Sequence, residues 1–233
     1  MTSRTSPAIT ELYQRFSNGA KLLAEFTPDT QVIYCRDVDK CHFGKAPTIR
    51  LVEKAYGRKT AMSWMEIQLY NLSEFAGCKE KLSPTQIAET AAMILDGYPC
   101  YKLTEFMLFF QRFKRCEYGK FYGAVDPMVI LQALSTFSEE RVLAITKRHQ
   151  AQQEEKQKKQ DAELDEICER YRRRVPDAFT DKAPIDFLQY RLMGFDCMDD
   201  ERLAKELEAI VSGEKKLPTD VMEMIRNSYN IND

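Results

Sequence analysis

Basic and aromatic residues concentrate in one stretch of the sequence, from Arg112 to Tyr122. The hexamer YGKFYG at 118–123 places a lysine and two aromatic residues between glycines. Lysine and arginine contact phosphates, and exposed aromatic rings stack on bases, so this combination is typical of surfaces that hold single-stranded nucleic acid. A tight loop whose rings fill the gap between two helix ends is the alternative interpretation.

A second basic cluster, three consecutive arginines at 172–174, joins this hypothesis as a phosphate-binding candidate. Arginines at the C-terminal end of a helix are also explained by the helix dipole alone. The candidate nucleic-acid-binding residues are Arg112, Lys114, Arg115, Tyr118, Lys120, Tyr122, Arg172, Arg173 and Arg174.

The residue types of common catalytic sites are sparse. The sequence has two histidines, and neither lies in a nucleophile, zinc-protease, dinucleotide or phosphate-loop motif. Adjacent carboxylates such as Glu139 and Glu140 point about 100° apart on a helix, so they indicate surface charge rather than an acid–base pair. We therefore expect no enzymatic activity and no cofactor.

Cys35, Cys41 and His42 lie close together and have to be considered as metal ligands. A structural zinc site needs four ligands at characteristic spacing, and here no fourth ligand stands nearby, so no metal is predicted. The seven cysteines are scattered and form no CxxC pair. Together with an N-terminus that lacks a signal-peptide pattern, they indicate reduced thiols in a cytoplasmic protein. No apolar run approaches the roughly 20 residues of a membrane span.

The elements that position these residues are predicted to be helices, and the fold class all-α. Ser83, Pro84 and Gln86 have the spacing of a capping box with proline at the first helical position. A second helix is expected from Thr104, and Asp126-Pro127 opens a third by the same capping logic. Together with helices at 47–56 and 60–75, these segments form a compact helical core at 46–137.

The N-terminal segment, 1–45, is predicted to contain one helix and an irregular part. Apolar periodicity indicates a helix at 9–26, in which Gly19 introduces a break or a bend. The run QVIYC at 31–35 is strand-like, but one short strand has no identifiable partner. We expect that run to be extended or irregular.

A long helical pattern follows the core, because no proline or glycine occurs between Pro127 and Pro176. Its charged part, 138–175, is a solvated spacer or half of a coiled coil, so oligomerisation through 138–174 is a candidate role. The acidic C-terminal segment, 176–233, is expected to hold helices at 184–193 and 199–211 and a short one from Pro218.

Charge is unevenly distributed along the chain, although the whole chain carries a net charge of only −2. Residues 101–174 carry 15 basic and 12 acidic side chains, whereas residues 175–233 carry 7 and 13. The chain as a whole therefore offers no general attraction to nucleic acid, and any such attraction has to be local.

The run LTEFMLFFQRFKRCEYGKFYGAVDPMVILQALSTFSEER, at 103–141, resembles uncharacterised proteins of Bacteroides-type mobile elements and prophages. The resemblance covers about residues 47–141 and implies no particular activity. The layout, a compact helical part followed by a charged C-terminal part, is also similar to phage helicase loaders and replication accessory proteins. That second likeness is one of layout.

These observations support two function hypotheses. The first is a non-enzymatic DNA-replication accessory protein of a mobile element, which binds a replicative helicase, single-stranded DNA or both. The alternative is a protein–protein interaction adaptor without nucleic-acid contact, which uses 138–174 to oligomerise or to present the acidic segment. Both hypotheses predict a protein partner and no membrane.

Overall fold

A computed structural model describes residues 6–217 of the chain. The predicted all-α class is confirmed, since the described residues form helices, turns and two isolated bridge pairs but no strand. The chain divides into two compact units, unit 1 (1–148) and unit 2 (149–233). The short helix expected from Pro218 lies outside the described residues.

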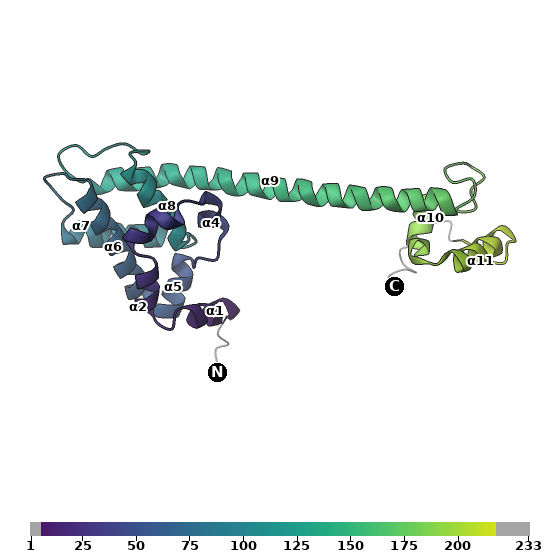
Figure 1. Cartoon of the computed structure of the whole chain (residues 1–233), viewed down its shortest axis with the longest axis horizontal. Helices are drawn as coiled ribbons and strands as arrows, with labels where there is room; N and C mark the ends of the chain where they lie inside the picture. Colours follow the sequence, from purple (N-terminus) through teal and green to yellow (C-terminus); the bar gives the residue numbers. More distant parts are fainter. Residues whose placement is uncertain (1–5, 218–233) are drawn as a thin grey trace. The chain divides into compact units, whose positions relative to one another are not determined.

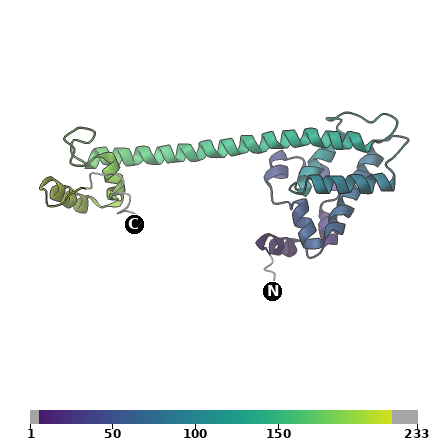
Figure 2. The ribbon, with the colours of Figure 1, turned by 180° about the vertical axis from the view of Figure 1, so that it is seen from behind.

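Unit 1 consists of helices joined by short turns (Figures 1 and 2). In chain order they are α1 (Pro7–Arg15), α2 (Gly19–Glu25), η1 (Pro28–Thr30), α3 (Gln31–Tyr34), α4 (Val38–Phe43), α5 (Ile49–Tyr56), α6 (Arg58–Phe75), α7 (Pro84–Gly97), α8 (Leu103–Lys114) and the first part of α9 (Pro127–Arg174). The helical pattern predicted to run from Pro127 is thus confirmed as one 48-residue helix.

The core of unit 1 is built around α8. Apart from Gln111, Arg112 and Lys114, every residue of this helix is buried, so it is covered on several sides. Phe106, Phe109 and Phe110 are fully buried, and Trp64 of α6 packs edge-on against Phe106. Burial of such large rings is the main favourable term in the folding of this unit.

The sequence signals for helix starts are confirmed where they depend on local capping. Ser83 and Gln86 form both hydrogen bonds of the predicted capping box at the start of α7. Asp126 accepts a hydrogen bond from Met128 N at 2.8 Å, at the start of α9. Such caps satisfy amide groups that have no partner inside the helix.

The prediction of an extended or irregular run at 31–35 is wrong, because 31–34 form α3. Val32 and Ile33, which suggested a strand, are exposed, whereas Gln31 is buried and donates to Gln68 Oε1 at 2.6 Å. A tertiary contact through the polar residue has overridden the local strand preference of the apolar ones.

The helix predicted at 9–26 is two helices, with the break at 16–18. Asn18 caps α2 by accepting from Lys21 N at 2.9 Å. Gly19 packs closely on α6, since a Cβ at this position would lie 2.9 Å from Thr60. A side chain here would crowd Thr60, so glycine allows this close approach, and the break itself lies just before Gly19.

Unit 2 begins within α9 and contains α10 (Phe187–Leu192), η2 (Phe195–Cys197) and α11 (Asp200–Val211). Helices α10 and α11 correspond to those predicted at 184–193 and 199–211, whereas η2 was not predicted. The unit has its own small core, whose buried members are Tyr171, Val175, Ile185, Tyr190, Phe195, Leu203 and Leu207. Tyr171 of α9 anchors it by donating to Ile185 O at 2.7 Å.

Among residues 6–217, no helix is long and apolar enough to cross a membrane.

Candidate nucleic-acid interface

Two loops lie side by side at one end of unit 1 (Figures 1 and 2). The α6–α7 loop meets the α8–α9 turn through Val125 N, which donates to Glu80 O at 3.0 Å, and through an isolated bridge between Glu80 and Ala124. Lys81 Nζ ties the α6–α7 loop down by donating to Ser73 O and Glu74 O at 3.0 Å. The predicted YGKFYG turn is thus held against a second loop.

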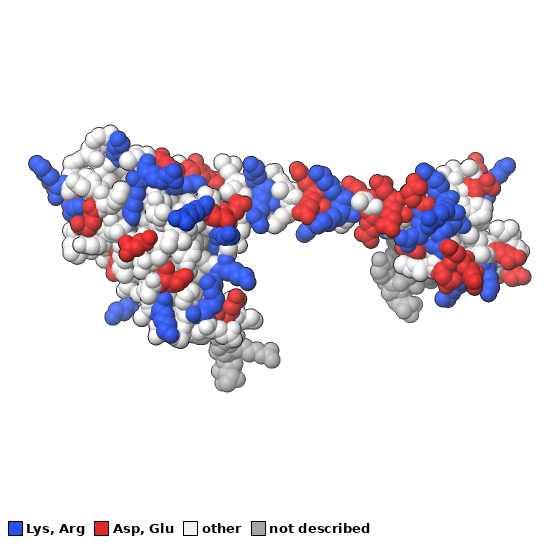
Figure 3. Space-filling model, viewed as in Figure 1, with Lys and Arg blue, Asp and Glu red and all other residues white. Residues whose placement is uncertain are grey.

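Exposed cations and rings gather at this end. We define the turn surface as Phe75, Lys79, Arg115, Lys120 and Tyr122, all of which are exposed. Phe75 is 61% exposed and Tyr122 is 88% exposed, which are unusual values for aromatic side chains. Figure 3 shows basic side chains over part of this end of unit 1, with acidic ones among them.

A hollow of about 190 Å³ opens within the turn surface. Phe75 and Phe121 form apolar walls, and Lys114 and Lys120 contribute cations. Gly119 in its wall has a φ of +103°, a backbone conformation that glycine adopts without strain. The hollow combines flat apolar surface with positive charge, as a site for a base and its phosphate requires.

Lys114 is part of the floor of this hollow rather than a free surface cation. Its Nζ donates to Gln31 Oε1 at 2.8 Å and to Asn71 Oδ1, and it lies 5.5 Å from the centre of the Phe75 ring. Burial lowers the pKa of Lys114, an effect that the charge of Asp29 opposes. Its ammonium group is solvated by two neutral amides and forms no direct ion pair with a described carboxylate.

Arg112 and Tyr118 are engaged inside the unit. Arg112 Nη1 lies 2.6 Å from Glu140 Oε2, which also accepts a hydrogen bond from the Tyr118 hydroxyl at 3.0 Å. The Tyr118 ring stacks on Phe109, and burial raises the pKa of Tyr118 to about 12. Arg112 thus joins α8 to α9, and Tyr118 joins the α8–α9 turn to α9, as the tight-loop interpretation expects.

The three arginines at 172–174 lie in unit 2 and make different contacts. Arg172 pairs with Glu169 at 2.9 Å, and Arg173 is exposed. The Arg174 side chain is only 8% exposed; it donates to Tyr190 Oη at 3.0 Å and to the carbonyl oxygens of Phe195 and Met198, and it lies 2.6 Å from Asp200. Arg174 thus holds the unit together, and the three do not form one surface.

Two members of the turn surface, Phe75 and Lys79, are absent from the sequence-based set. Phe75 is the last residue of α6 and Lys79 lies in the α6–α7 loop, both 35 residues or more before the α8–α9 turn. The run CKEK at 78–81 contains two lysines and one glutamate, so the sequence indicates a local positive charge there. Nothing local indicated that this loop would pair with the YGKFYG turn.

Unit 2 contains a larger hollow, which we call the α11 groove, of about 670 Å³. Its walls are mainly apolar and include Leu203, Leu207 and Val211 along one side of α11. Val211 is 74% exposed. Arg173 and Lys182 also line the groove.

The candidate metal residues are each used in packing. His42 Nδ1 lies 2.9 Å from Glu105 Oε1, and Cys41 Sγ lies 3.3 Å from Tyr34 O. Within the described residues, no group of three or more histidine, cysteine or acidic side chains is placed to hold a metal ion.

Comparison with known proteins gives one match. The model of a family described as "Family of unknown function (DUF6633)" matches residues 81–172, which include α7, α8, the α8–α9 turn and nearly all of α9. No curated protein and no solved structure matches the chain. Over residues 81–172 the chain is therefore similar to an uncharacterised protein family, which agrees with that part of the predicted resemblance.

Proposed function

We propose that the chain is a non-enzymatic accessory protein of DNA replication in a mobile element, and that its turn surface holds single-stranded DNA. A replicative helicase is the proposed protein partner. The observation that carries the proposal is the hollow between Phe75 and Lys120, where the exposed Phe75 ring and the half-buried Phe121 ring meet the side chains of Lys114 and Lys120.

Exposed rings favour a single strand over a duplex. An unpaired base stacks on any flat aromatic face, and each stacked base contributes about 1–3 kcal/mol irrespective of its identity. Phe75 and Tyr122 offer such faces, whereas bases in a duplex are already stacked on one another. The turn surface has no helix or ribbon shaped for a major groove, so sequence-specific duplex binding is not expected.

The charge of the turn surface is local, which fits the nearly neutral chain. Lys79 and Lys120 form no ion pair with a described residue, and Arg115 has only a 3.6 Å contact with Glu117. Lys114 adds a buried positive charge beneath the hollow. Binding through these few cations predicts a moderate dependence on salt.

The first experiment measures the fluorescence anisotropy of a labelled oligothymidylate at about 50 and 200 mM salt, with a duplex of equal length for comparison. We expect tighter binding to the single strand. Replacing Arg115 and Lys120 by alanine removes two phosphate contacts, and the log–log salt slope should fall by about 1.4. Replacing Phe75 and Tyr122 by alanine should weaken binding at least about tenfold with little change in slope.

Lys54→Ala with Lys59→Ala is the matched control, because both lysines are exposed and Lys59 lies in the first turn of the helix that Phe75 ends. The span of α6 separates Lys59 from Phe75 by about 24 Å. Equal loss of binding in this control and in the Arg115–Lys120 variant would remove the turn surface from the proposal. Lys114 is left unchanged, since its loss would disturb Gln31 and Asn71.

The α11 groove favours the adaptor as a second candidate function. Its apolar walls along one face of α11 have the character of a groove that receives an amphipathic helix. The same binding experiment separates the two functions. Absence of binding to either DNA at low salt would leave the adaptor, with a protein partner at unit 2, as the better hypothesis.

A further inference from the structure

The α11 groove exposes apolar surface beside the core of unit 2. Leu203 and Leu207 line the groove and belong to that core, whereas Ala204 and Val211, which also line it from α11, are exposed. The other residues of its lining come from the end of α9 and from the loop at 175–186. Apolar surface that continues a core in this way is typical of a site that another segment covers.

The charged side chains that line the α11 groove carry an excess of positive charge. They are three cations, Arg173, Arg174 and Lys182, and two carboxylates, Asp200 and Glu208. Arg174 and Asp200 pair with one another at 2.6 Å. Arg173 and Lys182 are exposed and form no ion pair with a described residue. The groove therefore favours an occupant that carries negative charge.

After α11 the chain folds back onto unit 2. Gly213 has a φ of +81°, and Lys215 N donates to Ala209 O at 2.9 Å, so the chain reverses its direction at the end of the helix. Leu217 then packs against the core of unit 2. Residues 218–233 therefore begin at the same small core that borders the groove, which gives them an effective concentration there on the order of millimolar.

The sequence of residues 218–233 has an apolar pattern that suits the groove. In the helix predicted from Pro218, four apolar residues recur at i, i+1, i+4 and i+8 and so share one face: Val221, Met222, Ile225 and Tyr229. This face covers eight helical steps, as does the side of α11 from Leu203 to Val211, so each is about 12 Å long. The segment has three acidic residues and one basic residue, which gives it the negative charge that the groove favours.

We propose that residues 218–233 dock into the α11 groove of the same chain, with their apolar face on Leu207 and Val211, and thereby close it. A free peptide of this length would bind weakly, but the attachment to unit 2 makes the docking intramolecular. The inference does not rest on DNA binding, since the turn surface lies in unit 1. For the adaptor it adds a regulatory step, because a partner helix would first have to displace this segment.

The test is photo-cross-linking in the full chain, with the photoreactive residue benzoylphenylalanine in place of Tyr229 on the apolar face. Trypsin cuts after Arg174, Lys182, Arg191 and Arg226. A docked segment would therefore link peptide 227–233 to peptide 175–182 or 183–191, which hold the loop residues of the groove lining and lie far away in the chain. Mass spectrometry identifies the linked peptides, and a denaturing gel shows whether one chain or two are joined.

Benzoylphenylalanine in place of Asn227 is the matched control. Asn227 lies in the same tryptic peptide but on the opposite side of the predicted helix, so we expect the link to the groove peptides to be lost. A segment that only passes near the groove would give the same links from both positions.

Two variants of α11 complete the test. Ala204→Glu with Val211→Glu puts charges at exposed positions of the groove, and the yield of the Tyr229-position link should fall about tenfold or more. Lys205→Glu, at an exposed position outside the groove lining, changes the net charge by the same amount and should leave the yield unchanged. Circular dichroism checks that both variants keep their helices.

Three results would overturn the proposal. The first is the absence of any link to peptides 175–182 and 183–191, and the second is equal links from the positions of Tyr229 and Asn227. The third is a product that joins two chains, which would make a second copy the occupant of the groove.

Discussion

At the scale of single residues, Glu105 is a carboxylate with no exposed surface, so its charge needs compensating partners inside the unit. Its oxygens accept from Arg141 Nε at 2.7 Å and Lys102 N at 2.8 Å, and His42 Nδ1 lies at 2.9 Å. Arg141 in turn lies over the Tyr101 ring, 4.2 Å from its centre. One buried charge therefore connects α4, α8 and α9, and its removal would leave Arg141 without its partner.

We expect Glu105→Gln to cost on the order of 3 kcal/mol at neutral pH, since it leaves a buried charge uncompensated. Burial alone would raise the pKa of Glu105, but hydrogen bonds from His42, Arg141 and Lys102 outweigh it and hold the pKa below the ordinary value of 4.5. The stabilisation is thus complete above pH 4.5 and is lost as pH falls through the lower folded-state pKa. Urea unfolding at pH 7 and at about pH 3 measures both parts.

Glu139→Gln is the control for that change, because Glu139 is an exposed carboxylate that forms no ion pair with a described residue. Its free energy of unfolding should change by less than about 0.5 kcal/mol. A Glu105→Gln penalty equally large at both pH values would mean that packing, and not the charge, is what the substitution disturbs.

Residue types were predictable from sequence, but their partners were not. Arg112, Lys114 and Tyr118 have the chemistry of a nucleic-acid surface, yet their partners lie 28, 83 and 22 residues away. Local patterns contain no information on such contacts. Arg115, Lys120 and Tyr122 remain exposed because no distant residue reaches them.

At the scale of elements, a helix can be predicted from sequence when the residues that determine it lie close together in the chain. Ser83 and Gln86 lie within one turn of each other, so the sequence alone identifies the start of α7. The helical state of 31–34 depends on a contact between Gln31 and Gln68. The strand preference of the apolar residues therefore gave a wrong prediction for this run. The same applies to the two loops of the turn surface, whose pairing joins distant segments.

The local cap at Ser83 gives an element-scale prediction. Ser83→Ala removes the side chain that accepts from Gln86 N at 3.3 Å, and we expect a loss of about 1 kcal/mol in the free energy of unfolding. Thr85→Ala, two residues later on the exposed first turn, is the matched control and should change stability by less than about 0.5 kcal/mol. Equal effects of the two variants in urea titrations would argue against a capping role for Ser83.

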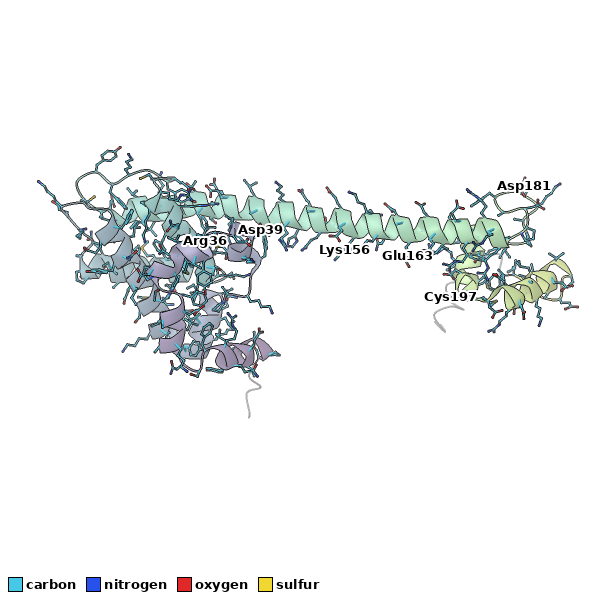
Figure 4. All side chains as sticks on the ribbon, in the orientation of Figure 1. Arg36, Asp39, Lys156, Glu163, Asp181 and Cys197 are labelled. Carbon is cyan, nitrogen blue, oxygen red and sulfur yellow. The ribbon has the colours of Figure 1, made fainter. Side chains whose placement is uncertain are left out.

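At the scale of the whole molecule, the chain has two hydrophobic cores that share no residue. Between Arg148 and Ile167, the residues of α9 are exposed, and side-chain bonds within the helix, such as Glu155–Lys159 at 2.6 Å, accompany its backbone ladder. Lys156 and Glu163, labelled in Figure 4, belong to this stretch. Pairs of this kind contribute only about 0.3–0.5 kcal/mol each.

The predicted oligomerisation through 138–174 would use exposed residues of α9, among which Val142, Leu143 and Leu164 are apolar. Ile167 and Tyr171 lie at apolar positions that a coiled coil would need, but they pack in the core of unit 2. The part of α9 at 149–163 has no apolar seam, since it presents polar residues such as Gln153, Gln157 and Gln160. The stretch 149–163 therefore offers a second copy little hydrophobic burial, and oligomerisation through 138–174 remains a prediction.

Two separate cores and an exposed connecting stretch give the last prediction, which concerns limited proteolysis. Proteases cut where a helix opens locally, and opening costs least where no tertiary contact has to be broken. Within residues 6–217, we expect trypsin to cut first after Lys156, Lys158 or Lys159, roughly tenfold faster or more than inside either unit. Mass spectrometry of a time course identifies the cut, and circular dichroism of the two purified fragments shows whether each keeps its helices.

Replacing the three lysines by glutamine should slow the first cut without changing helicity. If cleavage instead begins inside unit 1 or unit 2, or if the unit 2 fragment loses its helices on release, the two cores are not independently stable.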